Sequence, residues 1–83
     1  MDTSTLKSLM LNDNGFAFEP QTGDSFQLSP VGIHIVRKLL EQQSEDSIVH
    51  SITNEFEVST DIARRDLEGF LLSLNELQLI RSQ

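Results

Sequence analysis

The sequence predicts an α+β domain in which a meander of three antiparallel strands precedes a bundle of three helices. Two observations predict this order: alternating apolar residues in the first third of the chain, and three amphipathic patterns in the rest, each preceded by a capping residue. The 83 residues allow one domain, spanning 1–83, with a core just large enough to be stable without disulfides.

The first strand is expected between Leu6 and Leu11. The apolar residues of this segment suit a short helix about as well as a strand. We favour the strand because the run from Asn12 to Gly15 is a dense turn signal directly before the next alternating segment.

A β-hairpin is predicted over 15–28. Its alternating apolar residues are Phe16, Phe18, Phe26 and Leu28. Between the two strands, Pro20 presets a turn that Gly23 can close with positive φ. Ser29 and Pro30 are typical of the N-cap and first turn of a helix, so the last strand ends there. A strand that enters a helix so abruptly often lies at a sheet edge, where a peptide can extend it.

The first two long helices follow. The first runs from Pro30 to about Gln42, and its expected buried residues are Gly32, Ile35, Val36, Leu39 and Leu40. Glycine lowers helix propensity, so Gly32 is predicted to permit close packing on the sheet. The second helix spans 45–56 after a Ser44 cap, and its expected buried residues are Ile48, Ile52 and Phe56.

The third helix, 60–76, is the longest, and either Ser59 or Thr60 caps it. Its apolar stripe makes it the central element of the core, and comprises Ala63, Leu67, Phe70, Leu71, Leu74 and Leu77. Leu79 and Ile80 are predicted to pack back as a short tail.

Composition excludes several functions. The chain has no cysteine, so thiol nucleophiles and thiolate metal sites are ruled out. It has no apolar run long enough to span a membrane and no signal-peptide pattern, so we expect a cytoplasmic protein. We also expect a monomer or a weak homodimer. The net charge of −7 repels phosphate backbones and disfavours nucleic acid as a partner.

The polar residues show no catalytic pattern. His34 and His50 fall on the polar sides of their helices without a ligand partner at i+3 or i+4, and we expect both to be solvated. The acidic residues are spread over caps and exposed faces, and no glycine-rich phosphate loop is present. The sequence therefore predicts neither an enzyme nor a cofactor or metal site.

A second candidate surface lies on the third helix. Leu72 points nearly opposite the apolar stripe, an unusual position for leucine. We interpret it as part of a mixed wall that faces a partner, together with Arg64, Arg65, Glu68 and Leu71. The adjacent arginines on a helix-turn-helix spacing also suggest a small winged helix-turn-helix regulator that binds DNA. Acidic neighbours and the negative net charge favour salt-bridged surface arginines instead.

The chain resembles the PqqD family, named for protein D of pyrroloquinoline quinone biosynthesis and also called the RiPP precursor peptide recognition element. The resemblance spans about Leu6 to Ile80. The residues that carry it are Gly15-Phe16, Phe18-Glu19-Pro20, Thr22-Gly23, Phe26, Leu28, Gly32, the run from Ile48 to Phe56, and the run from Asp66-Leu67 to Leu79-Ile80.

This resemblance implies a winged-helix-like fold of three strands and three helices. It also implies a chaperone that presents a precursor peptide to a modifying enzyme, often a radical S-adenosylmethionine maturase. The leader segment of the peptide would add to the third strand beside the third helix. The implied peptide-binding residues are Asp24, Ser25, Phe26, Gln27 and Leu28 on the strand, joined by the wall residues of the third helix. Gln78 stands where relatives often carry a glycine, which puts the left-handed closure of the last helix in question.

Overall fold

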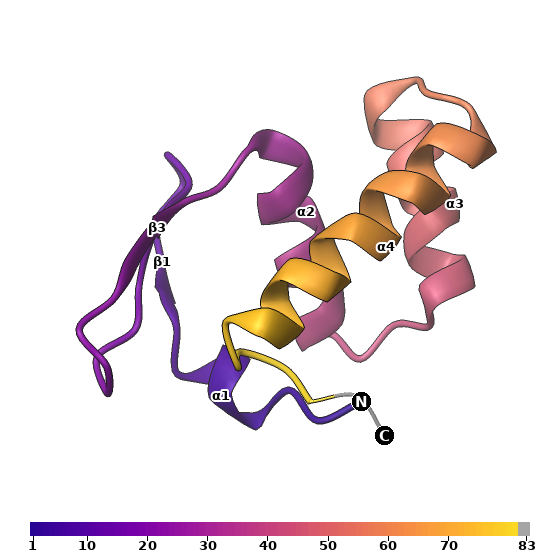
Figure 1. Ribbon diagram of the computed structural model, residues 1–83. Helices are drawn as coiled ribbons and strands as arrows, with labels where there is room; N and C mark the ends of the chain where they lie inside the picture. The colour runs from indigo at the N-terminus through magenta and orange to yellow at the C-terminus, as the bar shows by residue number, and fades with distance from the viewer. Residues whose placement is uncertain (82–83) are drawn as a thin grey trace.

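The computed structural model describes residues 1–81 (Figure 1). The elements in chain order are α1 (Ser4–Lys7), β1 (Met10–Leu11), β2 (Phe16–Phe18), β3 (Ser25–Gln27), α2 (Pro30–Leu40), α3 (Glu45–Phe56) and α4 (Thr60–Glu76). The sheet lies on one side of α2 and α4, and α3 lies on the other (Figure 1). The α+β fold with a three-stranded antiparallel sheet before the long helices is confirmed.

The sheet is a meander with the order β1-β2-β3, so β3 lies at an edge. Ala17 of β2 faces Phe26 of β3. Gly23 closes the β2–β3 turn with φ of 79°, as predicted. Gly15 sets where the hairpin begins, because its φ is 89° and a Cβ there would lie 2.4 Å from the carbonyl oxygen of Leu28.

The predicted first strand is correct only for its last residues. Met10 and Leu11 form β1, but Leu6 belongs to the short helix α1 and is fully buried. The Asp2 carboxylate, one residue before the N-cap Thr3, accepts a hydrogen bond of 2.9 Å from the backbone N–H of Ser4, the first residue of this helix. The backbone of Asp2 pairs with that of Arg81, which joins the two ends of the described chain.

Serine caps all three long helices. The hydroxyl of Ser29 accepts from the N–H of Gly32 at 3.1 Å, and Ser44 and Ser59 make the equivalent bonds in α3 and α4. Ser59, and not Thr60, is therefore the cap of α4. Helix α2 ends at Leu40, earlier than predicted, because Gln42 has a positive φ of 63° and cannot continue the helix.

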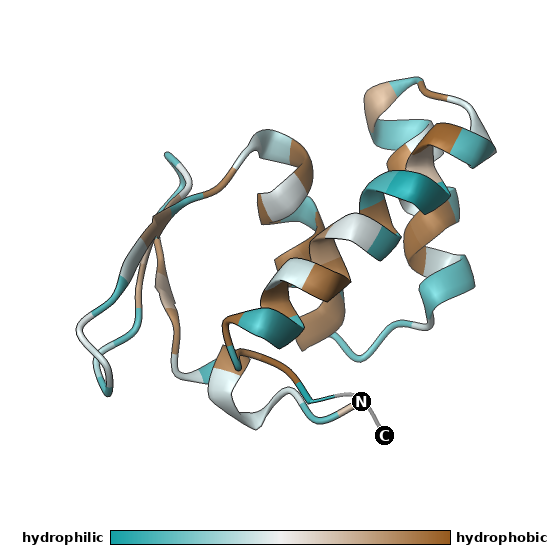
Figure 2. Ribbon diagram, viewed as in Figure 1, coloured by the Kyte–Doolittle hydropathy of each residue, from teal (hydrophilic) through white to brown (hydrophobic). Residues whose placement is uncertain are grey.

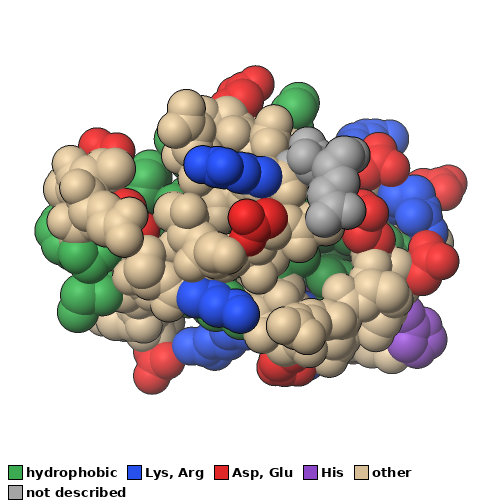
Figure 3. Space-filling view, turned by 90° about the horizontal axis from the view of Figure 1, so that it is seen from below, with side chains coloured by type: hydrophobic (Ala, Val, Ile, Leu, Met, Phe, Trp, Pro, Cys, Tyr) green, Lys and Arg blue, Asp and Glu red, His purple; other side chains and the backbone are tan. Residues whose placement is uncertain are grey.

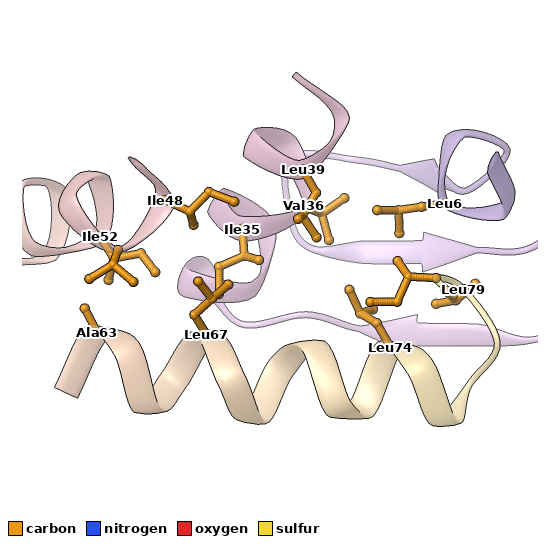
Figure 4. Packing of buried hydrophobic residues seen from close by; sticks show 12 residues of the cluster. Leu6, Ile35, Val36, Leu39, Ile48, Ile52, Ala63, Leu67, Leu74 and Leu79 are labelled. Atoms are coloured by element: carbon orange, nitrogen blue, oxygen red, sulfur yellow. The ribbon is translucent and has the colours of Figure 1, made fainter. Parts of the chain in front are cut away.

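The core lies between α2, α3 and α4, and α1 and the C-terminal segment close one end of it (Figure 4). Hydrophobic and hydrophilic segments alternate along the helices, as amphipathic packing requires (Figure 2). The buried apolar residues are Leu6, Ala17, Ile35, Val36, Leu39, Ile48, Val49, Ile52, Ala63, Leu67, Leu74, Leu79 and Ile80. The periodicity therefore predicted most of the core from the helices, and missed Leu6, Ala17 and Val49.

Three packing predictions need correction. Leu40 and Leu77 are exposed, and each lies at the carboxyl end of its helix. Gly32 is buried as predicted, but it packs against Phe70 of α4 and not against the sheet.

The chain beyond α4 turns back onto the core. Gln78 takes a left-handed φ of 61°, so a glycine is not required for this closure. The N–H of Leu79 then donates to the carbonyl of Leu74 at 2.9 Å. Leu79 and Ile80 become buried, which confirms the predicted tail. Within residues 1–81, no helix is long and apolar enough to cross a membrane.

Candidate functional site

The outer edge of β3 presents unpaired backbone groups. The hairpin bonds run from Leu28 N–H to Gly15 C=O at 2.8 Å and from Glu19 N–H to Asp24 C=O at 2.9 Å. Because such bonds alternate along an antiparallel strand, Phe26 also faces β2 with its backbone, and Ser25 and Gln27 direct their N–H and C=O groups away from the sheet. Both of these residues can therefore pair with an additional strand.

A groove runs between this edge and α4, and we name it the β3–α4 groove. Its central cavity, about 320 Å³, is mainly apolar and is lined by Phe26, Leu28, Phe70, Leu74 and Leu77, among others. Apolar side chains of an added strand can be buried here while its backbone pairs with β3.

Two further cavities continue the groove in opposite directions. The α2-end cavity, about 440 Å³, shares Phe70 with the central one and is lined by Arg65 and Gly69. The hairpin-end cavity, about 210 Å³, shares Phe26 and Leu77 with the central one and is lined by Asp24. The groove is therefore long, apolar in the middle and polar at both ends.

Most of the strand residues predicted to bind peptide lie at this groove. Phe26, Gln27 and Leu28 line the central cavity, Asp24 lines the hairpin-end cavity, and Ser25 lies on the open edge. Their role in binding a peptide stays a prediction.

The predicted wall on α4 divides differently. Arg65 lines the α2-end cavity. Arg64 pairs with Asp46 of α3 at 3.2 Å, and Leu71 packs partly buried against the core. Glu68 and Leu72 are exposed and line none of the three cavities.

The helix period explains this division, because the residues that line the groove lie on the other flank of the apolar stripe. Besides Arg65 and Leu74, they are Asp66, Gly69, Phe70, Ser73 and Leu77. Sequence reasoning assigned Phe70 and Leu77 to the core and missed the others. The sequence offered one signal for this flank, which is the glycine at position 69 inside a helix. In the structure, no atom lies within 4 Å of the place that a Cβ of Gly69 would occupy.

The opposite face of the sheet is apolar and open. Met10, Phe16 and Phe18 form what we call the outer sheet face, with exposed fractions of 62%, 46% and 36%. Ala17, between the two phenylalanines, points into the core instead. Hydrophobic side chains accordingly gather on the side of the molecule where the sheet lies (Figure 3).

His34 is not solvated as predicted, whereas His50 is exposed. The Nε2 atom of His34 lies 2.7 Å from the Ser51 hydroxyl, and its ring meets that of Phe56 edge-on at 5.5 Å. Burial between α2 and α3 lowers the pKa of His34, and the positive charge of Lys38 lowers it further. His34 therefore connects α2 to α3, and it lies outside the β3–α4 groove.

Glu19 is a buried carboxylate at the start of the β2–β3 turn. Its oxygens accept hydrogen bonds from the Ser8 hydroxyl at 3.0 Å and from the Gln21 N–H at 2.9 Å. In the part of the chain that the structure describes, no group of three or more His, Cys, Asp or Glu side chains is arranged to hold a metal ion.

Comparisons with known proteins identify the family of the chain and structures of the same fold. The family model described as "Coenzyme PQQ synthesis protein D (PqqD)" matches residues 8–80. The solved structure "TbiB1 in Complex with the TbiA(beta) Leader Peptide" is 29% identical, with a TM-score of 0.83 over 100% of this chain and 98% of that one. The structure "Lasso peptide synthetase B1 complexed with the leader peptide" is 30% identical, with a TM-score of 0.73 over 83% and 82% of the two chains. The comparison with curated proteins found no match.

Proposed function

We propose that this chain, which belongs to the PqqD family, is a non-catalytic recognition module that binds the leader segment of a ribosomally made precursor peptide by β-strand addition. The similar structures, by their descriptions, hold leader peptides, which supports this class of ligand. The observation that carries the proposal is the open edge of β3 beside an apolar groove.

The backbone supplies the general part of the affinity. In the bound state the leader pairs with the outward groups of Ser25 and Gln27 and becomes the fourth strand of the sheet. Because neighbouring side chains of a strand point to opposite faces, every second leader residue enters the β3–α4 groove. Phe70 and Leu77 then contact those residues and make the binding selective.

A presenting module also needs a surface for the enzyme that acts on the peptide. We assign this role to the outer sheet face, whose three exposed apolar side chains belong to the same sheet that the peptide would extend. An enzyme on this face lies directly beside the bound leader. The modifying enzyme, such as a radical S-adenosylmethionine maturase, is the occupant we propose for this face.

Nothing favours the DNA-binding alternative. The net charge of −7 opposes the phosphate contacts that dominate such binding, and Arg64 is already paired with Asp46.

Titration with a labelled leader peptide tests the proposal. The precursor peptide encoded nearest this gene should bind, and its core segment without the leader should not. Phe16→Ser should keep leader affinity yet slow modification by the partner enzyme, whereas the matched control Leu72→Ser should do neither. Equal binding of leader and core segments would contradict the proposed function.

A further inference from the structure

One carboxylate of this fold is buried without a cationic partner. Glu19 is 1% exposed, and both of its hydrogen-bond donors, the Ser8 hydroxyl and the Gln21 amide, are neutral. Among residues 1–81, no Lys, Arg or His nitrogen lies within 4.0 Å of its oxygens. Proteins normally pair a buried charge, because taking an isolated carboxylate out of water is costly. A cationic partner for the Glu19 carboxylate would therefore come from a bound molecule.

Glu19 lines the hairpin-end cavity of the β3–α4 groove, as does the exposed carboxylate of Asp24. The carboxyl end of α4 reaches the same cavity through Leu77 and Gln78. The last turn of α4 contains no basic residue to complement the partial negative charge at its carboxyl end, and Arg81 is the one basic residue among the described residues that lines this cavity. The two carboxylates of Glu19 and Asp24 outnumber the single guanidinium of Arg81 in this cavity. The local charge therefore favours the binding of a cation.

We propose that the hairpin-end cavity receives a lysine or arginine side chain of the leader peptide, which pairs with Glu19 and Asp24. The inference rests on the proposed function, since the strand added to β3 carries that side chain into place. A carboxylate offers about four acceptor positions, and the internal donors of Glu19 occupy two of them. The remaining positions accept the hydrogen bonds of an ammonium or guanidinium group.

The basic residue also fixes how the leader lies. The central cavity accepts apolar side chains of many shapes, so it defines neither direction nor register by itself. A cation required at one end, with apolar residues at alternate positions leading away from it, defines both. The net charge of −7 further favours the encounter with a basic peptide.

Selection from a random library tests this without knowledge of the natural leader. Phage-displayed random 12-residue peptides are panned on the wild-type protein and on Glu19→Gln. The wild type should enrich peptides with alternating apolar residues and a lysine or arginine at one fixed position relative to them. The Glu19→Gln variant should keep the apolar preference and lose the basic one.

Affinities of one enriched peptide give the magnitude. Glu19→Gln should weaken binding about tenfold or more, as expected for a lost charge-assisted hydrogen bond. Changing the basic residue of the peptide to norleucine, with the wild-type protein, should weaken binding to the same degree and does not depend on how the variant folds. Glu55→Gln, an exposed charge removal on α3, is the matched control and should leave affinity unchanged.

The outcomes separate the two ideas. Enriched peptides without a basic preference would overturn this inference and leave strand addition intact, whereas the absence of any enriched peptide would overturn both. Among residues 1–81, Arg81 is the one basic residue that could pair with Glu19 instead, because it also lines the cavity. If Arg81→Ala lowers the melting temperature of the wild type but not that of Glu19→Gln, Arg81 is the partner and the inference is wrong.

Discussion

The ring of Phe70 lies 3.0 Å from the position that a Cβ atom on Gly32 would occupy. Helices α2 and α4 therefore meet at a contact that glycine makes possible. Because Phe70 lines both the central and the α2-end cavity, this contact also sets one wall of the proposed peptide groove.

Gly32→Ala should leave the melting temperature nearly unchanged and weaken peptide binding. Alanine gains up to about 1 kcal/mol in helix propensity, which offsets the strain of a shifted ring. Phe70 is only partly buried, so its ring can move, and the space into which it moves is the groove. Thermal melts and leader titrations measure the two effects separately. A large fall in melting temperature with unaltered affinity would show that the ring does not move into the groove.

Leu67→Ala should destabilise the fold by about 2 to 5 kcal/mol, because Leu67 is 1% exposed at the centre of the helical core (Figure 4). Urea unfolding measures the change in free energy. The matched control is Leu72→Ala on the same helix, where the side chain is 61% exposed and the change should be small. Equal losses at the two positions would refute the assigned core.

The free energy of unfolding should decrease at acid pH, because His34 becomes protonated there. Its pKa in the fold is lowered, so the unfolded chain binds more protons than the folded one below the usual histidine range. The stabilising contribution is complete above pH 6.5 and is lost as the pH falls through the lowered folded pKa. Urea unfolding of the wild type and His34→Gln at pH 7.5 and 5.5 checks this. The variant should lose less stability on acidification, and an equal loss in both would rule out His34 as the cause.

Ser25→Pro should abolish or strongly weaken leader binding in a folded protein. The N–H of Ser25 points away from β2, so proline removes a donor that only an added strand uses. Phe26→Pro is the contrasting variant, since its N–H belongs to the hairpin and its loss should lower the melting temperature. Circular dichroism and leader titration distinguish the two, and unaltered leader affinity of Ser25→Pro would count against pairing at this edge.

Local signals in the sequence predicted most of the fold. A serine cap is a contact within three residues, so Ser29 and Ser44 could be assigned from the chain alone. The burial of Leu6 could not be predicted from the chain alone, because α1 has too few residues to show a helical period. This short helix is stabilised by packing against residues that are distant in sequence.

The residues of the candidate groove were predictable on the strand and, apart from Arg65, not on the helix. Hairpin alternation locates Phe26 and Gln27 at the groove. The stripe of α4 shows which side is buried, but the flank that borders the sheet depends on how the helices pack. Leu72 and Ser73 are neighbours in sequence, and only Ser73 reaches the groove.

Amide chemical-shift mapping with the leader peptide tests strand addition most directly. We predict that the largest perturbations fall on Ser25 and Gln27, with a second group at Gly69, Ser73 and Leu77 along the groove side of α4. The amides of α3, on the far side of the helical bundle (Figure 1), should change little. Perturbations centred on α3 with β3 unaffected would contradict the proposed binding mode.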